Sequence, residues 1–533
     1  MTSSSSSSSP SLQILTREPS GFSLSTGPPF ADGHPGVKLQ GSPCSSSSFS
    51  PDGSLLLAVT DSNAAVRLYD TSTFAETLSF QIAGVAAAVI SPRSTYLQTF
   101  RKPSPGSQQE KNVVLWNTTT SAPVYELFQK NISKTTPTIR FSDDESVACR
   151  MATNEIQFFD AKDFSKGILY RLRIPGLVAM ELPKSPASHV AAFVPESKGI
   201  PASVQIFSCE KNLQSQAVAR RSFFRCSSVQ MLWNRGSTGL LVVAQSDVDK
   251  SNQSYYGETK LNYLTTDGSH EGHVPLRKEG PVHDVQWSPL GTEFVVVYGF
   301  MPAKVTLFDK KCNPIFELGT GPYNTLRWNP RGKRILYKHF DFLMIMLEYY
   351  SIVQAFWDCS EKKLLGTTKS ECSVTCEWSP DGRYLMTATT APRLQIDNGI
   401  KIFHHDGSLY YKKMYDKLYQ AEWKPEALDK FGDVEELTKA VKESFKIDSS
   451  NKGSKPLRPA QPSQPSVKAS NPPQKAAAYR PPHAKSVAAV QAELFGETGP
   501  SEEISKNALR NKKKREKQRE KKAAEAASSI NGS

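Results

Sequence analysis

The sequence contains no run of about 18 uncharged apolar residues, which leaves no candidate for a membrane-spanning helix. The nearest candidate, from Ile335 to Trp357, is interrupted by Lys338, Asp341 and Glu348. The N-terminal residues lack the basic segment and the apolar core of a secretory signal. Their serine run is acid-poor, as in organellar transit peptides, but it has too few basic residues to favour that alternative. We therefore expect a cytoplasmic protein that does not enter a membrane.

Cysteine is also scarce, with eight residues in 533 and no pair at C-x-x-C spacing. This density disfavours a disulfide scaffold, and no set of four ligands has zinc-finger spacing, so we expect reduced thiols and no metal. The segment from Asp247 to Glu258 has part of a calcium-loop pattern, but Asn252 stands where glycine is needed. A polar hairpin tip is the favoured interpretation. No nucleophile, base and orienting residue form a recognisable set, so we expect neither an enzyme nor a cofactor.

Charge is unevenly distributed along the chain. The net charge is +13, and the residues from Lys446 onward contain 18 basic and 8 acidic side chains, which gives this part +10. The first 445 residues therefore contribute only +3. A concentrated positive tail indicates a polyanionic partner, either a nucleic acid or an acidic surface, although a solvated tail without a partner is the alternative.

A turn signature recurs throughout residues 45–430. It consists of an apolar residue, then Ser, Asn or Lys, then Pro or Asp, often followed by Gly, which predicts a tight turn between two strands. Successive copies are 39 to 54 residues apart. Tryptophans at this position should be largely buried between neighbouring units. The copies begin at Phe49, Ile90, Phe141, Trp233, Trp287, Trp328, Trp378 and Trp423, with a weaker copy at Met180.

A second signature follows most copies of the first. It is a short strand of alternating apolar and polar residues that ends in an aromatic and, in most copies, a polar residue. The two signals at this period are typical of WD-type blades with four strands each. We therefore predict an all-β fold, a WD40-type β-propeller with nine blades, or with seven or eight if the Met180 copy is not a blade. The strand copies are Val66–Asp70, Val113–Asn117, Ile156–Asp160, Val204–Phe207, Leu261–Leu264, Val305–Asp309, Ala355–Asp358 and Ile400–Phe403.

The last copy, at Trp423, is not followed by enough strands to complete a blade. An open edge in a ring is costly, and Leu12–Leu15 with Gly21–Leu24 has the pattern of a hairpin that would fill it. A short helix is expected from Val434 to Phe445. The predicted organisation is a disordered Ser-rich start (residues 1–10), a propeller (11–430), a short helix (431–447), a flexible linker (448–500) and a basic helix (501–530).

The basic helix is the sharpest binding feature of the sequence. Between Ser505 and Lys522 there are ten Lys or Arg residues and two Glu, a net charge of +8 in 18 residues. Apolar residues are too few for a coiled-coil seam, so we expect a monomer whose basic side chains contact RNA or ribosomal phosphates. The candidate contacts are Lys506, Arg510, Lys512, Lys513, Lys514, Arg515, Lys517, Arg519, Lys521 and Lys522.

Several longer strings resemble the eukaryotic translation initiation factor 2A family, a single-chain factor distinct from the trimeric GTP-binding factor. The resemblance covers most of the chain, and the basic stretch occupies the matching position in the tail. The most specific strings are Ser197–Ala202, Leu232–Asn234, Ser246–Lys250, Ser254–Glu258, Tyr298–Lys304, Leu318–Pro322, Thr387–Arg393, Asn398–Gly399 and Ala478–Pro482.

This resemblance implies a nine-bladed propeller followed by a basic helical tail. It also implies binding to the small (40S) ribosomal subunit and delivery of initiator methionyl-tRNA, codon-dependent and without GTP, on a subset of mRNAs. The alternative is a WD-repeat scaffold that organises protein partners and has no direct RNA function.

One segment departs from the family pattern. Residues 335–354 are aromatic, apolar and free of glycine, where the family has a glycine-containing strand and loop. If the segment is foreign to the blade, as a mis-spliced or mispredicted exon would be, it should pair poorly and expose apolar side chains, which puts the seventh blade in question; the alternative is a genuine blade segment.

Overall fold

The computed structural model describes residues 11–30, 43–60, 65–102, 110–130, 137–184, 186–210, 216–247, 257–338, 353–369, 373–391, 393 and 395–431. The expected Ser-rich start, the helix from Val434 to Phe445, the linker and the basic helix all lie outside these residues.

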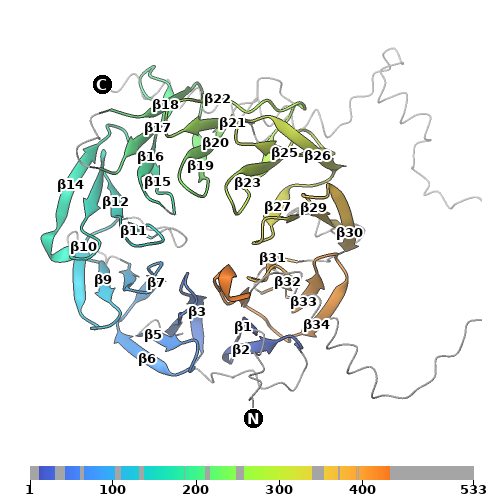
Figure 1. Ribbon diagram of the computed structural model, residues 1–533. Coiled ribbons are helices and arrows are strands. Elements are labelled where there is room, and N and C mark those ends of the chain that lie inside the picture. The colour runs from blue at the N-terminus through green and yellow to red at the C-terminus, as the bar shows by residue number, and fades with distance from the viewer. Residues whose placement is uncertain are drawn as a thin grey trace, which may run out of the picture. The chain divides into compact units, whose positions relative to one another are not determined.

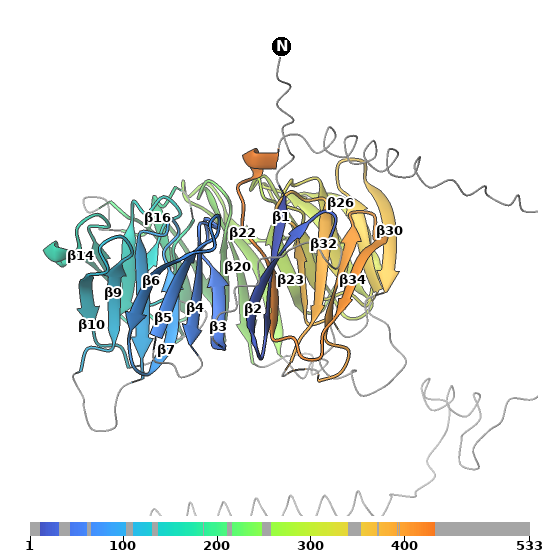
Figure 2. The same cartoon turned by 90° about the horizontal axis from the view of Figure 1, so that it is seen from below.

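The described residues form a ring of nine β-sheets, the blades of a propeller (Figure 1). Eight blades have four antiparallel strands and the ninth has three, so the prediction of a nine-bladed all-β propeller is confirmed. In the side view the strands run across the thickness of the ring (Figure 2). In the described part of the chain, the strands are accompanied by the short 3-10 helices η1 (Phe164–Lys166) and η4 (Leu428–Phe431).

Blades 1 to 4 follow one another along the chain, each a meander that runs outward from the ring axis. Their strands are β3 (Cys44–Phe49), β4 (Leu55–Thr60), β5 (Ala65–Asp70) and β6 (Glu76–Gln81); β7 (Val85–Ile90), β8 (Tyr96–Arg101), β9 (Val113–Asn117) and β10 (Pro123–Leu127); β11 (Arg140–Phe141), β12 (Ala148–Ala152), β13 (Glu155–Phe159) and β14 (Ile168–Arg173); β15 (Ala179–Glu181), β16 (His189–Val194), β17 (Ala202–Ser208) and β18 (Ala219–Phe223).

Blades 5 to 8 repeat this arrangement, and blade 9 joins the two ends of the ring. Their strands are β19 (Ser228–Trp233), β20 (Gly239–Ser246), β21 (Glu258–Thr265) and β22 (Glu271–His273); β23 (Val282–Trp287), β24 (Glu293–Tyr298), β25 (Ala303–Asp309) and β26 (Pro314–Gly321); β27 (Thr325–Trp328), β28 (Arg334–Lys338), β29 (Val353–Asp358) and β30 (Lys363–Lys369); β31 (Thr375–Trp378), β32 (Tyr384–Thr389), β33 (Gly399–His404) and β34 (Leu409–Met414); and, in blade 9, β2 (Gly21–Gly27), β1 (Leu12–Glu18) and β35 (Gln420–Trp423).

The position of a strand within its blade explains its composition. The second strand of blade 6, β24, has five buried residues out of six, because both of its faces pack against neighbouring blades. The outermost strand of blade 8, β34, has no buried residue and mixes Tyr with Lys, since one of its faces meets solvent. A continuous apolar run therefore marks a second strand such as β24, and polar side chains mark an outermost strand such as β34.

The recurrent turn joins the first and second strands of a blade, and its Ser or Asn has a specific task. In blade 1 the Leu55 backbone N–H donates to Ser50 Oγ at 2.9 Å, and in blade 5 the Gly239 N–H donates to Asn234 Oδ1 at 2.9 Å. A short polar side chain here satisfies a backbone donor that the tight turn would leave unpaired. The same bond recurs at Ser91, Ser142, Ser288 and Ser379.

The tryptophans before these turns connect neighbouring blades. Each indole N–H donates to a backbone carbonyl on the innermost strand of the preceding blade, at 2.9 to 3.2 Å. Trp328, Trp378 and Trp423 are between 6 and 9% exposed, as predicted, whereas Trp287 is only partly buried. The bonds are Trp233 to Glu181, Trp287 to Leu232, Trp328 to Gln286, Trp378 to Arg327 and Trp423 to Glu377.

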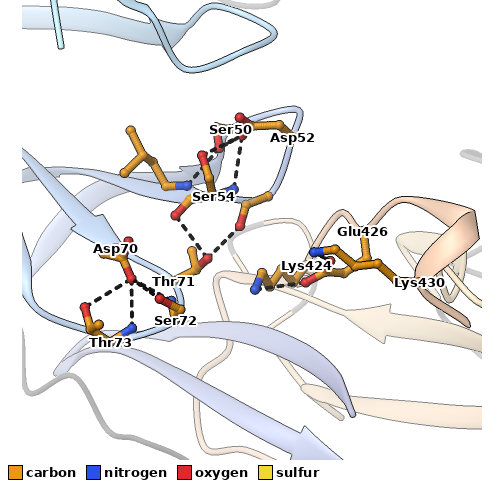
Figure 3. Close-up of polar contacts among 12 residues, drawn as sticks. Ser50, Asp52, Ser54, Asp70, Thr71, Ser72, Thr73, Lys424, Glu426 and Lys430 are labelled. Atoms are coloured by element: carbon orange, nitrogen blue, oxygen red, sulfur yellow. Dashed lines mark hydrogen bonds and ion pairs between the residues drawn. The ribbon is translucent and has the colours of Figure 1, made fainter. Parts of the chain in front are cut away.

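The N-terminal hairpin expected from the sequence closes the ring. Strands β1 and β2 pair with each other, and β1 also pairs with β35, with Ile14 opposite Trp423. The seam between blade 9 and blade 1 is tight, because the Pro425 carbonyl lies against Gly53 in the first turn. Figure 3 shows both sides of this seam: the hydrogen-bonded turns of blade 1, and the ion pairs of Glu426 with Lys424 (2.9 Å) and Lys430 (2.5 Å).

Two expectations about individual blades are settled by the strand pairing. The weak copy at Met180 lies on β15, the innermost strand of blade 4, so the alternatives of seven or eight blades are wrong. The expected poor pairing of residues 335–338 and 353–354 is also wrong, because β28 and β29 pair from Arg334 opposite Asp358 to Lys338 opposite Gln354. Blade 7 is complete, and residues 339–352 lie outside the described part of the chain.

Candidate nucleic-acid interface

None of the ten basic residues predicted to contact RNA lies among the described residues, since all of them follow Phe431. Their role therefore stays a prediction. Within the described residues, no group of three or more His, Cys, Asp or Glu side chains could hold a metal ion. No helix in the described part of the chain has the length and apolar character needed to cross a membrane.

The two described ends of the calcium-like segment have other partners. Asp247 Oδ1 accepts a hydrogen bond from Ser227 Oγ at 2.8 Å, and the Glu258 carboxylate pairs with Lys260 Nζ at 3.2 Å. Residues 248–256 lie outside the described chain.

Carboxyl groups on the innermost strands are held by backbone N–H groups of neighbouring blades. Asp284 on β23 accepts from the Leu326 N–H at 2.8 Å, and Glu422 on β35 accepts from the Phe49 N–H at 3.3 Å. Burial raises the pKa of Glu422 to about 7 and also raises the pKa values of Asp284 and Glu377. The bonds of Asp284 and Glu422 join neighbouring blades at their innermost strands, and Asp284 also lies 3.9 Å from a terminal nitrogen of Arg327.

A groove of about 740 Å³ lies between the outer strand of blade 4 and the strands of blade 5. One wall consists of β18 and the connection to β19. The other wall consists of the end of β20, the start of β21, and β22, which lies next to β18 in Figure 1. Four cationic side chains line the groove, together with one carboxylate, that of Glu258. The cations are Arg220, Arg221, Arg225 and Lys260.

Arg221 interrupts the apolar face that β18 turns toward blade 5. Its neighbours on that face, Ala219 and Phe223, are buried in the core shared with blade 5. Arg221 is partly buried, and its Nε atom is shielded from solvent without a hydrogen-bond partner among the described residues. A terminal nitrogen of its guanidinium lies 3.0 Å from His273 Nε2 on β22. Burial, together with the charges of Arg221 and Lys260, lowers the pKa of His273. Two cationic side chains, Arg221 from blade 4 and Lys260 from blade 5, therefore lie near this histidine where the two blades meet.

The mouth of the groove carries an exposed aromatic ring. Phe224 follows β18 directly and is 81% exposed, the highest value among the large exposed apolar side chains of the described chain. Carboxylates beside it hold the backbone on either side: Glu196 accepts from the Arg225 N–H and Glu271 from the Arg220 N–H, both at 2.8 Å. These bonds fix the backbone at two of the arginines that line the groove.

The sequence analysis did not identify this groove. Its signal is the string Arg220-Arg-Ser-Phe-Phe-Arg225, three arginines and two phenylalanines in six residues, which is a basic cluster with interleaved aromatics. The low net charge of the first 445 residues concealed it, because acidic residues elsewhere in the ring balance it.

Comparisons with known proteins agree with this architecture. A family profile described as "Eukaryotic translation initiation factor eIF2A" matches residues 221–421. The chain is 36% identical over 389 residues to "Eukaryotic translation initiation factor 2A" of Schizosaccharomyces pombe, which covers 73% of this chain and 66% of that protein. It is 31% identical over 395 residues to the protein of the same name in Caenorhabditis elegans, covering 71% and 67%.

A solved structure is similar as well. "Crystal structure of the eukaryotic initiation factor" superposes with a TM-score of 0.69 at 31% identity, covering 79% of this chain and all of that one. The matches to the two curated relatives span about two thirds of their lengths.

Proposed function

The chain belongs to the eukaryotic translation initiation factor 2A family, and we propose that it is a translation initiation factor that binds the 40S ribosomal subunit. In this proposal it directs initiator methionyl-tRNA to the subunit, codon-dependent and without GTP, on a subset of mRNAs. It acts in the cytoplasm as a monomer and catalyses no reaction. The observation that carries the proposal is the identity to factors of this name over 389 residues.

Two features of the chain support a direct RNA role. The tail contributes a net charge of +8 in 18 residues, a density that favours contacts with phosphates. The ring is closed by its own N-terminal hairpin, so it offers a rigid surface to a large partner. In the proposal the ring docks and the basic tail adds affinity.

Co-sedimentation with purified 40S subunits tests the role of the tail. Neutralising Lys512, Lys513, Lys514 and Arg515 to Gln should weaken binding, because each change removes one positive charge that would act on phosphates. The slope of log affinity against log salt should fall by about three to four units, or less where a side chain stays solvated.

A matched control removes four charges elsewhere in the tail. Neutralising Lys446, Lys452, Lys455 and Arg458 changes net charge by the same amount outside the basic stretch. If both variants bind 40S subunits like the unaltered chain, the tail has no role in binding. If the unaltered chain does not pellet with 40S subunits at all, the scaffold alternative replaces the proposal.

Delivery of the initiator tRNA needs its own measurement. Labelled initiator methionyl-tRNA should associate with 40S subunits in the presence of the chain and an AUG-containing RNA, equally with and without GTP. Retention that requires GTP, or that is equal without the AUG codon, would contradict this part of the proposal.

A further inference from the structure

We propose that the groove between blades 4 and 5 binds a single-stranded RNA segment, with phosphates on its cations and a base stacked on Phe224. This inference rests on the proposed RNA role and assigns a second contact surface to the ring, separate from the basic tail.

The cations of the groove are available to an anion. Lys260 is the one that pairs with a lining carboxylate, Glu258, at 3.2 Å. No ion pair occupies Arg220, Arg221 or Arg225 among the described residues, and the nearby Glu196 and Glu271 bind backbone N–H groups. The three guanidiniums therefore point to a ligand with several acceptor oxygens.

The buried nitrogen of Arg221 strengthens this assignment. A shielded N–H without a partner is costly, and a guanidinium placed on an apolar strand face needs compensation. His273 offers one contact, at 3.0 Å, but an imidazole carries no negative charge that could balance a guanidinium. A phosphate in the groove would lie beside Arg221, Lys260 and His273 and would supply the missing negative charge.

The exposed ring of Phe224 favours RNA over other anions. Aromatic side chains beside a basic groove are the usual arrangement for single strands, because bases stack on the ring while the backbone follows the cations. A free phosphate makes no use of the Phe224 side chain, which is 81% exposed next to Arg225. The groove volume of about 740 Å³ is sufficient for a short segment of single strand.

The test uses the full chain with Lys512, Lys513, Lys514 and Arg515 changed to Gln, so that the tail does not mask the groove. The probe is a fluorescein-labelled, unstructured RNA of about 12 nucleotides, within the size range of single-strand sites. Anisotropy titrations at several salt concentrations compare three groove variants with a control. The groove variants are Arg221→Gln with Arg225→Gln, Phe224→Ala, and Phe224→Trp; the control, Lys310→Gln with Lys311→Gln, removes two exposed charges from blade 6.

The double arginine variant should bind at least about tenfold more weakly and lose about 1.4 units of salt slope, 0.7 for each single-strand phosphate contact. Phe224→Ala should lose about tenfold with an unchanged slope, since stacking is not ionic, and Phe224→Trp should retain affinity. The control should bind like the parent. Thermal unfolding shows whether Arg221→Gln folds, and Phe224→Ala tests the same site at an exposed position.

Affinities of the groove variants equal to that of the control would overturn the proposal. Equal binding of a polyglutamate peptide, lost in the same variants, would also overturn it and indicate an acidic protein partner. Co-sedimentation of the unaltered chain with 40S subunits is measured separately. The anisotropy assay can therefore refute RNA binding in the groove without refuting the proposed initiation role. Conversely, a chain that does not bind 40S subunits would still give an interpretable anisotropy result.

Discussion

Substitution of Gly53 by alanine tests how tightly the ring is closed between blades 9 and 1. Gly53 lies in the first turn of blade 1 with φ +73°, and a Cβ placed on it would be 2.0 Å from the Pro425 carbonyl oxygen at the end of blade 9. Gly84, between blades 1 and 2, has the same φ of +73° but no atom within 4 Å of its Cβ position. The two glycines therefore share the backbone strain of an alanine substitution and differ in the seam contact.

The expected losses of stability follow from this comparison of the two glycines. A non-glycine residue at positive φ costs about 1 to 2 kcal/mol, and the reduced freedom of the unfolded chain returns about 0.4 to 1 kcal/mol. Gly84→Ala should therefore destabilise the protein by about 1 kcal/mol. Gly53→Ala must also displace the Pro425 carbonyl, an overpacking cost of about 1 to 3 kcal/mol, for a total near 2 to 4 kcal/mol.

Urea unfolding of the full chain, followed by tryptophan fluorescence, measures both variants. Repeating the pair in a chain that lacks residues 11–30 should reduce the difference, because β35 has then lost its partner and Pro425 can move. Stabilities of Gly53→Ala and Gly84→Ala within about 0.5 kcal/mol of each other in the full chain would refute the tight seam.

Two further predictions concern the innermost strands. Trp378→Ala should cost about 3 to 5 kcal/mol, because the indole is 8% exposed and bonded to the Arg327 carbonyl at 3.0 Å; a loss under about 1 kcal/mol in the same unfolding assay would contradict the blade register. The raised pKa of Glu422, about 7 against an ordinary 4.5, means that the folded ring retains a proton that the unfolded chain releases, so stability falls as pH rises between these values. Glu422→Gln should remove this contribution and gain about 1 to 3 kcal/mol at pH 8 but little at pH 4, as unfolding at both pH values will show.

The blade count was predictable because the turn residues have local duties. Ser50 or Asn234 is needed wherever a tight turn leaves a backbone N–H unpaired, so the residue types recur with the turn. The copy at Met180 has no aromatic residue at its start, but blade 4 still receives the bond from blade 5. The Trp233 indole donates to the Glu181 carbonyl, and any residue supplies a carbonyl.

The error at residues 335–338 and 353–354 has a physical cause. Apolar residues without glycine suggested a foreign segment, but Leu336 and Tyr337 on β28 and Phe356 on β29 lie in inner strands that are buried on both faces. Those positions require apolar side chains. Composition alone did not separate the strand ends from residues 339–352, whereas the register does.

The groove escaped prediction because its parts are separated along the chain. Arg221 and His273 are 52 residues apart, and each belongs to the outer strand of a different blade. Local periodicity places Arg221 on the face of β18 that should be apolar, where it is a departure from the pattern without an evident purpose. The position of Arg221 can be explained only from the folded structure, in which Lys260 and His273 of blade 5 line the same groove.

The ring and the tail would then recognise RNA by different physics. Lysines in the tail act as point charges, so their contribution weakens steeply with salt and carries no preference for sequence. The groove holds its guanidiniums on a fixed strand and adds a stacking ring, so part of its affinity should persist at high salt and should require unpaired bases. A factor built from both surfaces would be attracted to RNA in general by its tail and would be retained where a single strand is accessible to the groove. Because the two contributions respond differently to salt, titrations of the tail and groove variants over a range of ionic strength separate them.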